Sequence, residues 1–259
     1  MAFFFSYTVN MNNTLDTKQY LPFYKENFKK DTRWLKKETE HYIFNYFPDS
    51  LAEKEINFVA KRQEKAFVKI TSSLQLKPSK KKISYYIYPD AQTKKELMGD
   101  DWYAQSIYHD FCVHILYTSE IKPVGEHEDT HLLSLPWGLS IGFWAEGLAE
   151  YLAGHDWYGN SHNIKIREGF KKNILPLINS LMSHDAWMDL PDENAIYYYC
   201  LAGSFTKFII EKFGMEKFKE LYKETSRGKS KEENQKVFKK IYGIDIDEAE
   251  QEWKKMFSN

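Results

Sequence analysis

The chain has 259 residues, a formal net charge of −1, and 42% hydrophobic and 17% aromatic residues. This length is enough for one large domain or for two lobes that share a cleft, and the composition indicates a packed globular protein and excludes a disordered one. The near balance of 36 basic and 37 acidic residues excludes a global field that attracts nucleic acid or an anionic membrane, so neither is expected as a partner.

The N-terminus and the two cysteines bear on the compartment. Residues 1–7 contain a short apolar stretch with no basic residue before it, which is not the pattern of a secretory signal. No apolar run approaches the roughly 20 residues that span a bilayer. Cys112 and Cys200 lie far apart in the sequence, and we expect free buried thiols rather than a disulfide. These features predict a cytoplasmic protein, or a secreted one if a signal segment has been removed; they do not determine the oligomeric state.

The first part of the chain, residues 1–122, is predicted to form an α/β lobe. Its strands are rich in aromatic and β-branched residues, and its helix has apolar residues at helical spacing. The expected elements are strands at 41–47, 83–88 and 111–117, a helix at 51–76 and a turn at 78–82.

The second part, residues 123–259, shows helical patterns and no further strand pattern. Its charged stretch 226–240 is expected to contain a turn around Gly228 and a solvated helix face. The other expected helices are 125–133, 143–152, 164–175, 177–182, 197–213, 216–225 and 246–257.

One of these helices contains the sequence His127-Glu128-Asp129-Thr130-His131, which is an H-E-x-x-H motif. Residues four apart on a helix lie on the same face, so both imidazoles can bind one zinc ion. Glu128, next to the first histidine, is expected to act as the general base on a water at the open coordination position. The alternative is an ordinary charged surface turn.

A catalytic zinc takes a third protein ligand, and the next helix supplies candidates. Glu146 follows His131 after a gap that contains glycine and proline and is long enough to turn back. We expect Glu146 to be the third ligand and Glu150, one turn later, to accept a hydrogen bond from a ligating histidine. The two roles could be exchanged, and Glu150 could instead be a solvated helix residue.

The motif together with residues 144–151 (Trp-Ala-Glu-Gly-Leu-Ala-Glu-Tyr) resembles the gluzincin zinc metallopeptidases, a broad peptidase MA-like group related to thermolysin and the zinc aminopeptidases. Residues 199–214 and 242–253 resemble later helices of such proteins. The resemblance implies an α+β, thermolysin-like zincin fold, with a mixed sheet-and-helix N-terminal lobe and a mainly helical C-terminal lobe that together form one catalytic domain.

The resemblance also implies a reaction: hydrolysis of a peptide or protein substrate by a water activated on one Zn²⁺ per chain. An extended substrate is expected to pair with the strand at 111–117, taken as the sheet edge. Tyr199 matches the position that stabilises the oxyanion in the family, although Tyr197 and Tyr198 are rivals and a core role is equally compatible.

The sequence departs from thermolysin and the aminopeptidases in three respects. The gap between His131 and Glu146 is shorter, Glu150 stands where those enzymes have Asp, and there is no G-x-M-E-N motif, so specificity for a free N-terminus is not predicted. Two other functions stay open: a non-catalytic zinc-stabilised peptide-binding module, and an interaction scaffold with an accidental motif. The substrate sequence and the choice between endo- and exopeptidase are not predicted.

Overall fold

The computed structural model of the chain describes residues 25–77 and 81–258. The N-terminal segment considered above as a signal and residues 78–80 of the predicted turn lie outside the described residues. The described residues form two compact units, and the boundary between them follows Leu133. The first unit therefore includes the helix with the H-E-x-x-H motif, which the sequence analysis grouped with the helical second part.

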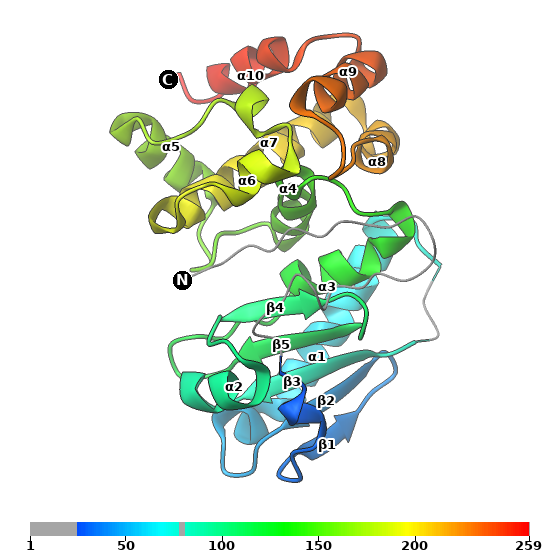
Figure 1. The fold of residues 1–259 in the computed structure, drawn as a ribbon, viewed down its shortest axis with the longest axis vertical. Helices are drawn as coiled ribbons and strands as arrows, with labels where there is room; N and C mark the ends of the chain where they lie inside the picture. The colour runs from blue at the N-terminus through cyan, green and yellow to red at the C-terminus, as the bar shows by residue number, and fades with distance from the viewer. Residues whose placement is uncertain (1–24, 78–80, 259) are drawn as a thin grey trace. The chain divides into compact units, whose positions relative to one another are not determined.

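The first unit is built on a five-stranded mixed sheet with the order β1-β2-β3-β5-β4 (Figure 1). The three central strands are parallel, and the strand at each edge is antiparallel to its neighbour. With the helices of both units, this sheet makes the protein an α+β structure, as predicted. The strands are β1 (Leu35–Glu38), β2 (Tyr42–Tyr46), β3 (Ile83–Tyr88), β4 (Ala104–Ile107) and β5 (Cys112–Leu116).

Helices cover both faces of this sheet. They are η2 (Asn27–Lys29), α1 (Leu51–Ser73), α2 (Ala91–Met98) and α3 (Glu126–Leu133). Side chains of a strand alternate between the faces. Tyr85 therefore points toward α1 and α3, to which it is hydrogen-bonded, whereas Tyr86 and His114 point the other way and contact Phe28 of η2.

The second unit, residues 134–258, is helical throughout its described length. Its helices are η3 (Leu135–Trp137), α4 (Gly142–Ala153), α5 (His162–Lys172), η4 (Ile178–Leu181), α6 (His184–Met188), η5 (Asp192–Asn194), α7 (Ala195–Phe213), α8 (Met215–Glu224), α9 (Lys231–Tyr242) and α10 (Ile246–Lys255). The core forms around the fully buried Trp144 of α4, whose ring stacks on Phe205 of α7 and on Phe238 of α9. Aromatic residues thus fill the centre of this unit, as the composition indicated.

The predicted strands and most of the predicted helices are confirmed, but one expectation is wrong. The strand at 111–117, β5, lies inside the sheet between β3 and β4 and is not its edge. The edge is β4, a four-residue strand with the sequence Ala-Gln-Ser-Ile. Such a short and polar segment shows too little alternation to be recognised as a strand.

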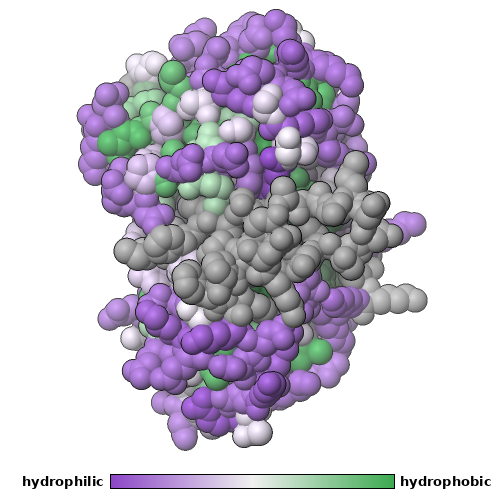
Figure 2. Space-filling model, in the orientation of Figure 1, coloured by the Kyte–Doolittle hydropathy of each residue, from purple (hydrophilic) through white to green (hydrophobic). Residues whose placement is uncertain are grey.

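The free, buried state predicted for Cys112 and Cys200 is confirmed. None of the helices within the described residues has the length and apolar character needed to cross a membrane. The face of the molecule seen in Figure 2 is mainly hydrophilic where it is coloured, with apolar residues scattered between polar ones. Isolated exposed apolar residues of this kind are normal on protein surfaces.

Candidate metal centre

Helix α3 places the two histidines of the motif side by side. The ring centroids of His127 and His131 are 5.1 Å apart, as expected for side chains one helical turn apart on the same face. His131 is buried and His127 is half-buried. The first unit therefore presents two adjacent imidazoles, the ligand type that zinc most often takes from a helix.

Glu128, the predicted general base, is fixed by a residue of the edge strand. The Ser106 hydroxyl lies 2.7 Å from the Glu128 carboxylate oxygen Oε2 and 2.8 Å from the Glu128 backbone oxygen. Ser106 is 9% exposed and Glu128 is half-buried. The carboxylate next to His127 is thus held by a hydrogen-bond donor from the sheet.

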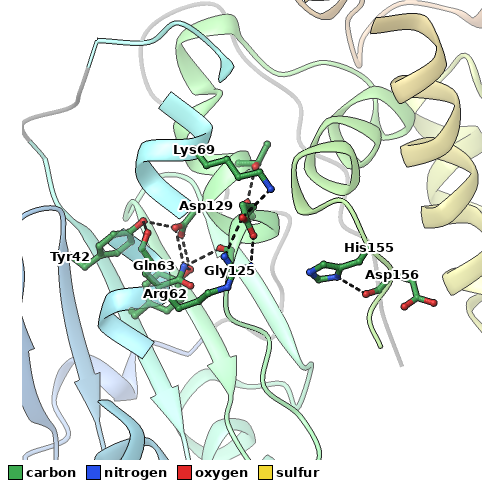
Figure 3. Close-up of polar contacts among 11 residues, drawn as sticks. Tyr42, Arg62, Gln63, Lys69, Gly125, Asp129, His155 and Asp156 are labelled. Carbon is green, nitrogen blue, oxygen red and sulfur yellow. Dashed lines mark hydrogen bonds and ion pairs between the residues drawn. The ribbon is translucent and has the colours of Figure 1, made fainter. Parts of the chain in front are cut away.

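Asp129, one of the two unspecified positions of the motif, is fully buried in a polar network (Figure 3). Its carboxylate accepts hydrogen bonds from the Tyr42 hydroxyl at 2.5 Å, the Tyr85 hydroxyl at 2.6 Å and the Gln63 amide at 2.9 Å. Burial raises the pKa of Asp129 to about 7, although these donors act in the opposite direction. The network ties α3 to β2, β3 and α1 at once.

Glu126, at the start of α3, makes a second link to α1. Arg62 and Lys69 donate to its two carboxylate oxygens at 2.6 and 3.1 Å (Figure 3). Burial raises the pKa of Glu126, but the hydrogen bonds from both cations outweigh it and hold the pKa below its usual range. Gly125, with φ +137°, turns the chain into the helix directly against Arg62.

The second unit carries both predicted glutamates on α4. Glu146 is half-buried, and Glu150 is 1% exposed. A ring nitrogen of His162 on α5 lies 2.7 Å from a Glu150 oxygen, so Glu150 is a buried hydrogen-bonded residue and not a solvated one. The predicted bond between Glu150 and a ligating histidine stays a prediction.

The N-terminus of α4, one turn before Glu146, is capped by a histidine. The ring nitrogen Nδ1 of His184 accepts a hydrogen bond from the backbone N–H of Gly142 at 3.2 Å. Burial and the charge of Arg227 lower the pKa of His184 to about 3, and Glu146 acts in the opposite direction. The imidazole is therefore neutral at pH 7, as an acceptor of this bond must be.

Two of the three tyrosines considered for the oxyanion, Tyr197 and Tyr199, differ in their surroundings. The Tyr197 hydroxyl accepts a hydrogen bond from Lys172 at 2.7 Å and lies 3.2 Å from Glu168, so α5 engages it. The Tyr199 ring makes edge contacts with the half-exposed Trp157 and the buried Trp187. The Tyr197 hydroxyl is thus bonded to side chains of α5, whereas the Tyr199 ring packs against two indole rings.

Comparisons with known proteins do not identify a family for the chain. No family model matches the chain, and a search of curated proteins finds no match. The resemblance to gluzincins therefore rests on the motif and the neighbouring helices alone.

A second group of possible metal ligands, outside the motif, is bridged by a lysine. Glu26, His109 and Asp110 of the first unit place one ligand atom each within 4.8 Å of the others. The Lys29 ammonium lies 3.2 Å from Glu26 and 2.8 Å from Asp110. Because this lysine forms an ion pair with both carboxylates, we interpret the group as an ion-pair cluster.

Several residues that shape the site were not found from the sequence. They are Tyr42, Arg62, Gln63, Tyr85 and Ser106, and each belongs to an element far from the motif in the chain. Gln63 was the one available signal, because it is a polar residue on the apolar stripe of α1 and a buried polar side chain requires a partner. Ser106 carried no signal because its strand was not recognised.

Proposed function

We propose that the chain is a zinc-dependent peptidase with a thermolysin-like arrangement, in which His127, His131 and Glu146 hold one Zn²⁺. The observation that carries this proposal is the pair of adjacent imidazoles on α3, together with Glu128, the residue after His127, whose carboxylate is held by Ser106. A structural zinc site needs no such base, whereas a hydrolytic site does.

The donor set fits zinc. Two imidazoles and one carboxylate are the ligands of many catalytic zinc sites, which keep a fourth position for water. His127, His131 and Glu146 each offer one such ligand atom, and none of the three side chains is exposed. A zinc ion held there would supply Lewis acidity and lower the pKa of a bound water to about 7.

Glu128 is assigned the proton transfers. Its carboxylate accepts the proton of the attacking water and returns it to the leaving amine, as a general base that becomes a general acid. The hydrogen bond from Ser106 occupies one side of Oε2 and leaves the second oxygen, Oε1, for the water. Tyr199 is assigned the hydrogen bond to the oxyanion because it matches that position in the family that the chain resembles. Its rival Tyr197 has a hydroxyl that accepts a hydrogen bond from Lys172.

The substrate is assigned to β4, the edge strand. The carbonyl of Tyr103 accepts a hydrogen bond from the Leu116 N–H. In an antiparallel pair, residues whose backbone groups face the partner strand alternate with residues whose backbone groups face away, so Tyr103, Gln105 and Ile107 face β5. The backbone groups of Ala104 and Ser106 point away from β5. An extended peptide can add to them as a further strand.

The decisive experiment measures zinc content and peptide cleavage in the same preparations. Wild type should contain about one zinc per chain and cleave members of a broad peptide library, and a chelator should abolish cleavage until zinc is restored. Glu146→Ala should lose zinc, while Glu128→Gln should keep zinc and lose cleavage. Glu216→Ala and Glu120→Gln, which change exposed glutamates, are the matched controls.

The outcomes separate the proposed function from its alternatives. Zinc without cleavage of any peptide would indicate a zinc-stabilised peptide-binding module. A chain that binds no zinc would refute the metal site and leave the motif accidental. For the oxyanion, Tyr199→Phe should lower kcat about 100-fold with zinc retained, and Tyr197→Phe should not.

A further inference from the structure

We infer that Ser106 is the positioning residue for Glu128, so that the substrate-binding edge of the sheet also sets the orientation of the general base. This inference rests on the proposed function. It starts from one side chain: the Ser106 hydroxyl lies 2.7 Å from Glu128 Oε2 and 2.8 Å from the Glu128 backbone oxygen. A hydroxyl has a single proton to donate, and an ionised carboxylate is a stronger acceptor than a carbonyl.

A glutamate that acts as a base has to be held in place. Its side chain has several rotatable bonds and loses considerable entropy when it is ordered. Catalysis requires the reacting groups to be positioned to within about half an ångström. Within the first unit, the Ser106 hydroxyl supplies an anchor for the Glu128 carboxylate, and it does so from a short side chain with a single rotatable bond before the oxygen.

The anchor itself is rigid. Ser106 is 9% exposed and stands opposite the fully buried Val113 of β5 in the antiparallel ladder. Asp129, the neighbour of Glu128, is held by hydrogen bonds from β2, β3 and α1. The donor and the helix that carries the base are therefore both fixed to the same sheet.

The position of Ser106 in β4 gives it two tasks. Its backbone N–H and C=O point away from β5, because residues Tyr103, Gln105 and Ile107 are those whose backbone groups face that strand. Its side chain points to α3 and reaches Glu128. A peptide strand added at this edge would bond to the residue that orients the base, so substrate register and base position are set together.

The test compares Ser106→Ala, Ser106→Thr and the control Ser84→Ala, which makes the same change in β3 of the same sheet. Ser106→Ala should lower kcat about 10- to 100-fold, the usual consequence of losing a hydrogen bond to a charged group, with KM within about twofold and zinc content unchanged. Ser106→Thr keeps the hydroxyl and should recover most of kcat. Ser84→Ala should match wild type.

A crystal structure of zinc-loaded Ser106→Ala supplies a readout that does not depend on turnover. The Glu128 carboxylate should leave the position it has in a wild-type crystal, while His127 and His131 stay in place. The inference would be overturned if Ser106→Ala kept its kcat, changed KM alone, or left the Glu128 carboxylate in place. In that case cleavage by the wild type would still support the proposed function. A wild type that binds zinc and cleaves nothing would refute the proposed function, and this inference with it.

Discussion

Replacing Gly147 with alanine tests the contact that positions α4, the helix of Glu146. A Cβ atom at Gly147 would lie 2.2 Å from the hydroxyl oxygen of Thr206 and 2.9 Å from the backbone oxygen of Ala202, both on α7. The Thr206 side chain can rotate away, but the carbonyl of Ala202 cannot, so the two helices must separate. Overpacking of a buried contact costs about 3 kcal/mol at the upper end of its usual range, and the better helix propensity of alanine offsets about 1 kcal/mol of that.

The net loss of unfolding free energy is therefore about 2 kcal/mol, which lowers the melting temperature of a chain of this size by about 4–8 °C. Urea denaturation followed by tryptophan fluorescence reports on the second unit, which holds five of the seven tryptophans, namely Trp137, Trp144, Trp157, Trp187 and Trp253. Gly228→Ala is the control, since the nearest atom to its added Cβ is 3.9 Å away, and it should change stability by less than about 0.5 kcal/mol. A Gly147→Ala chain as stable as the control would refute the close approach of α4 and α7.

Three further predictions concern buried polar groups. Burial holds the pKa of His114 well below its usual value, so only the unfolded chain takes up a proton here as the pH falls below about 6.5. Between pH 6 and 4, the wild type should therefore lose up to about 1.4 kcal/mol of unfolding free energy per pH unit relative to His114→Phe. Urea titrations of both chains measure this difference, and unfolding free energies that change equally with pH in the two chains would contradict it. Asp129→Ala removes the carboxylate that accepts from three buried donors and should cost about 3 kcal/mol in the same assay, although the Tyr42 hydroxyl and the Gln63 amide keep a backbone carbonyl as acceptor. A loss below about 1 kcal/mol would show that the network stabilises little. Cys112 and Cys200 should react with a thiol reagent only after unfolding, and rapid labelling of the native chain would show that they are not buried.

Elements with strong periodicity and clear ends could be predicted from the sequence. Helix α1 begins after Ser50, whose side chain accepts a hydrogen bond from the backbone N–H of Glu53, a capping signal that is visible in the sequence. Its apolar residues then recur at helical spacing for more than six turns. The helix ends at Ser73, three residues before the predicted end, because the chain turns at Gln75, where φ is +52°.

The elements that were missed are short. β1 has the sequence Leu-Lys-Lys-Glu and buries none of its four residues, so it lacks the alternation that marks a half-buried strand. β4 has two polar residues in four and is recognisable only through its partner β5. Helix α2 has eight residues, and its Asp90 N-cap and Gly99 C-cap were the local signals for it. Pairing with the rest of the sheet, and not local preference, determines these edge strands.

The motif predicted where the two histidines lie but not what surrounds them. Adjacency of His127 and His131 follows from helix geometry alone. The burial of Asp129 does not, because its donors Tyr42 and Tyr85 are 87 and 44 residues away in the chain. The alternative that the motif is an ordinary charged surface turn is wrong, since Asp129 and the neighbouring Glu126 are buried and hydrogen-bonded. The burial of these acidic side chains depends on tertiary contacts, which the motif does not contain.

These buried acids explain how a helix as polar as α3 can hold the proposed metal ligands in a fixed orientation. Its eight residues include three acids and two histidines, so apolar packing alone leaves its rotation weakly determined. Apolar contacts have no preferred direction, whereas hydrogen bonds weaken steeply when distance or angle changes. Asp129 accepts hydrogen bonds from three buried donors and Glu126 pairs with two cations of α1, and these bonds set the rotation of α3 about its axis. That rotation determines where His127 and His131 point, and replacing the acids should therefore weaken zinc binding even though neither is proposed as a ligand.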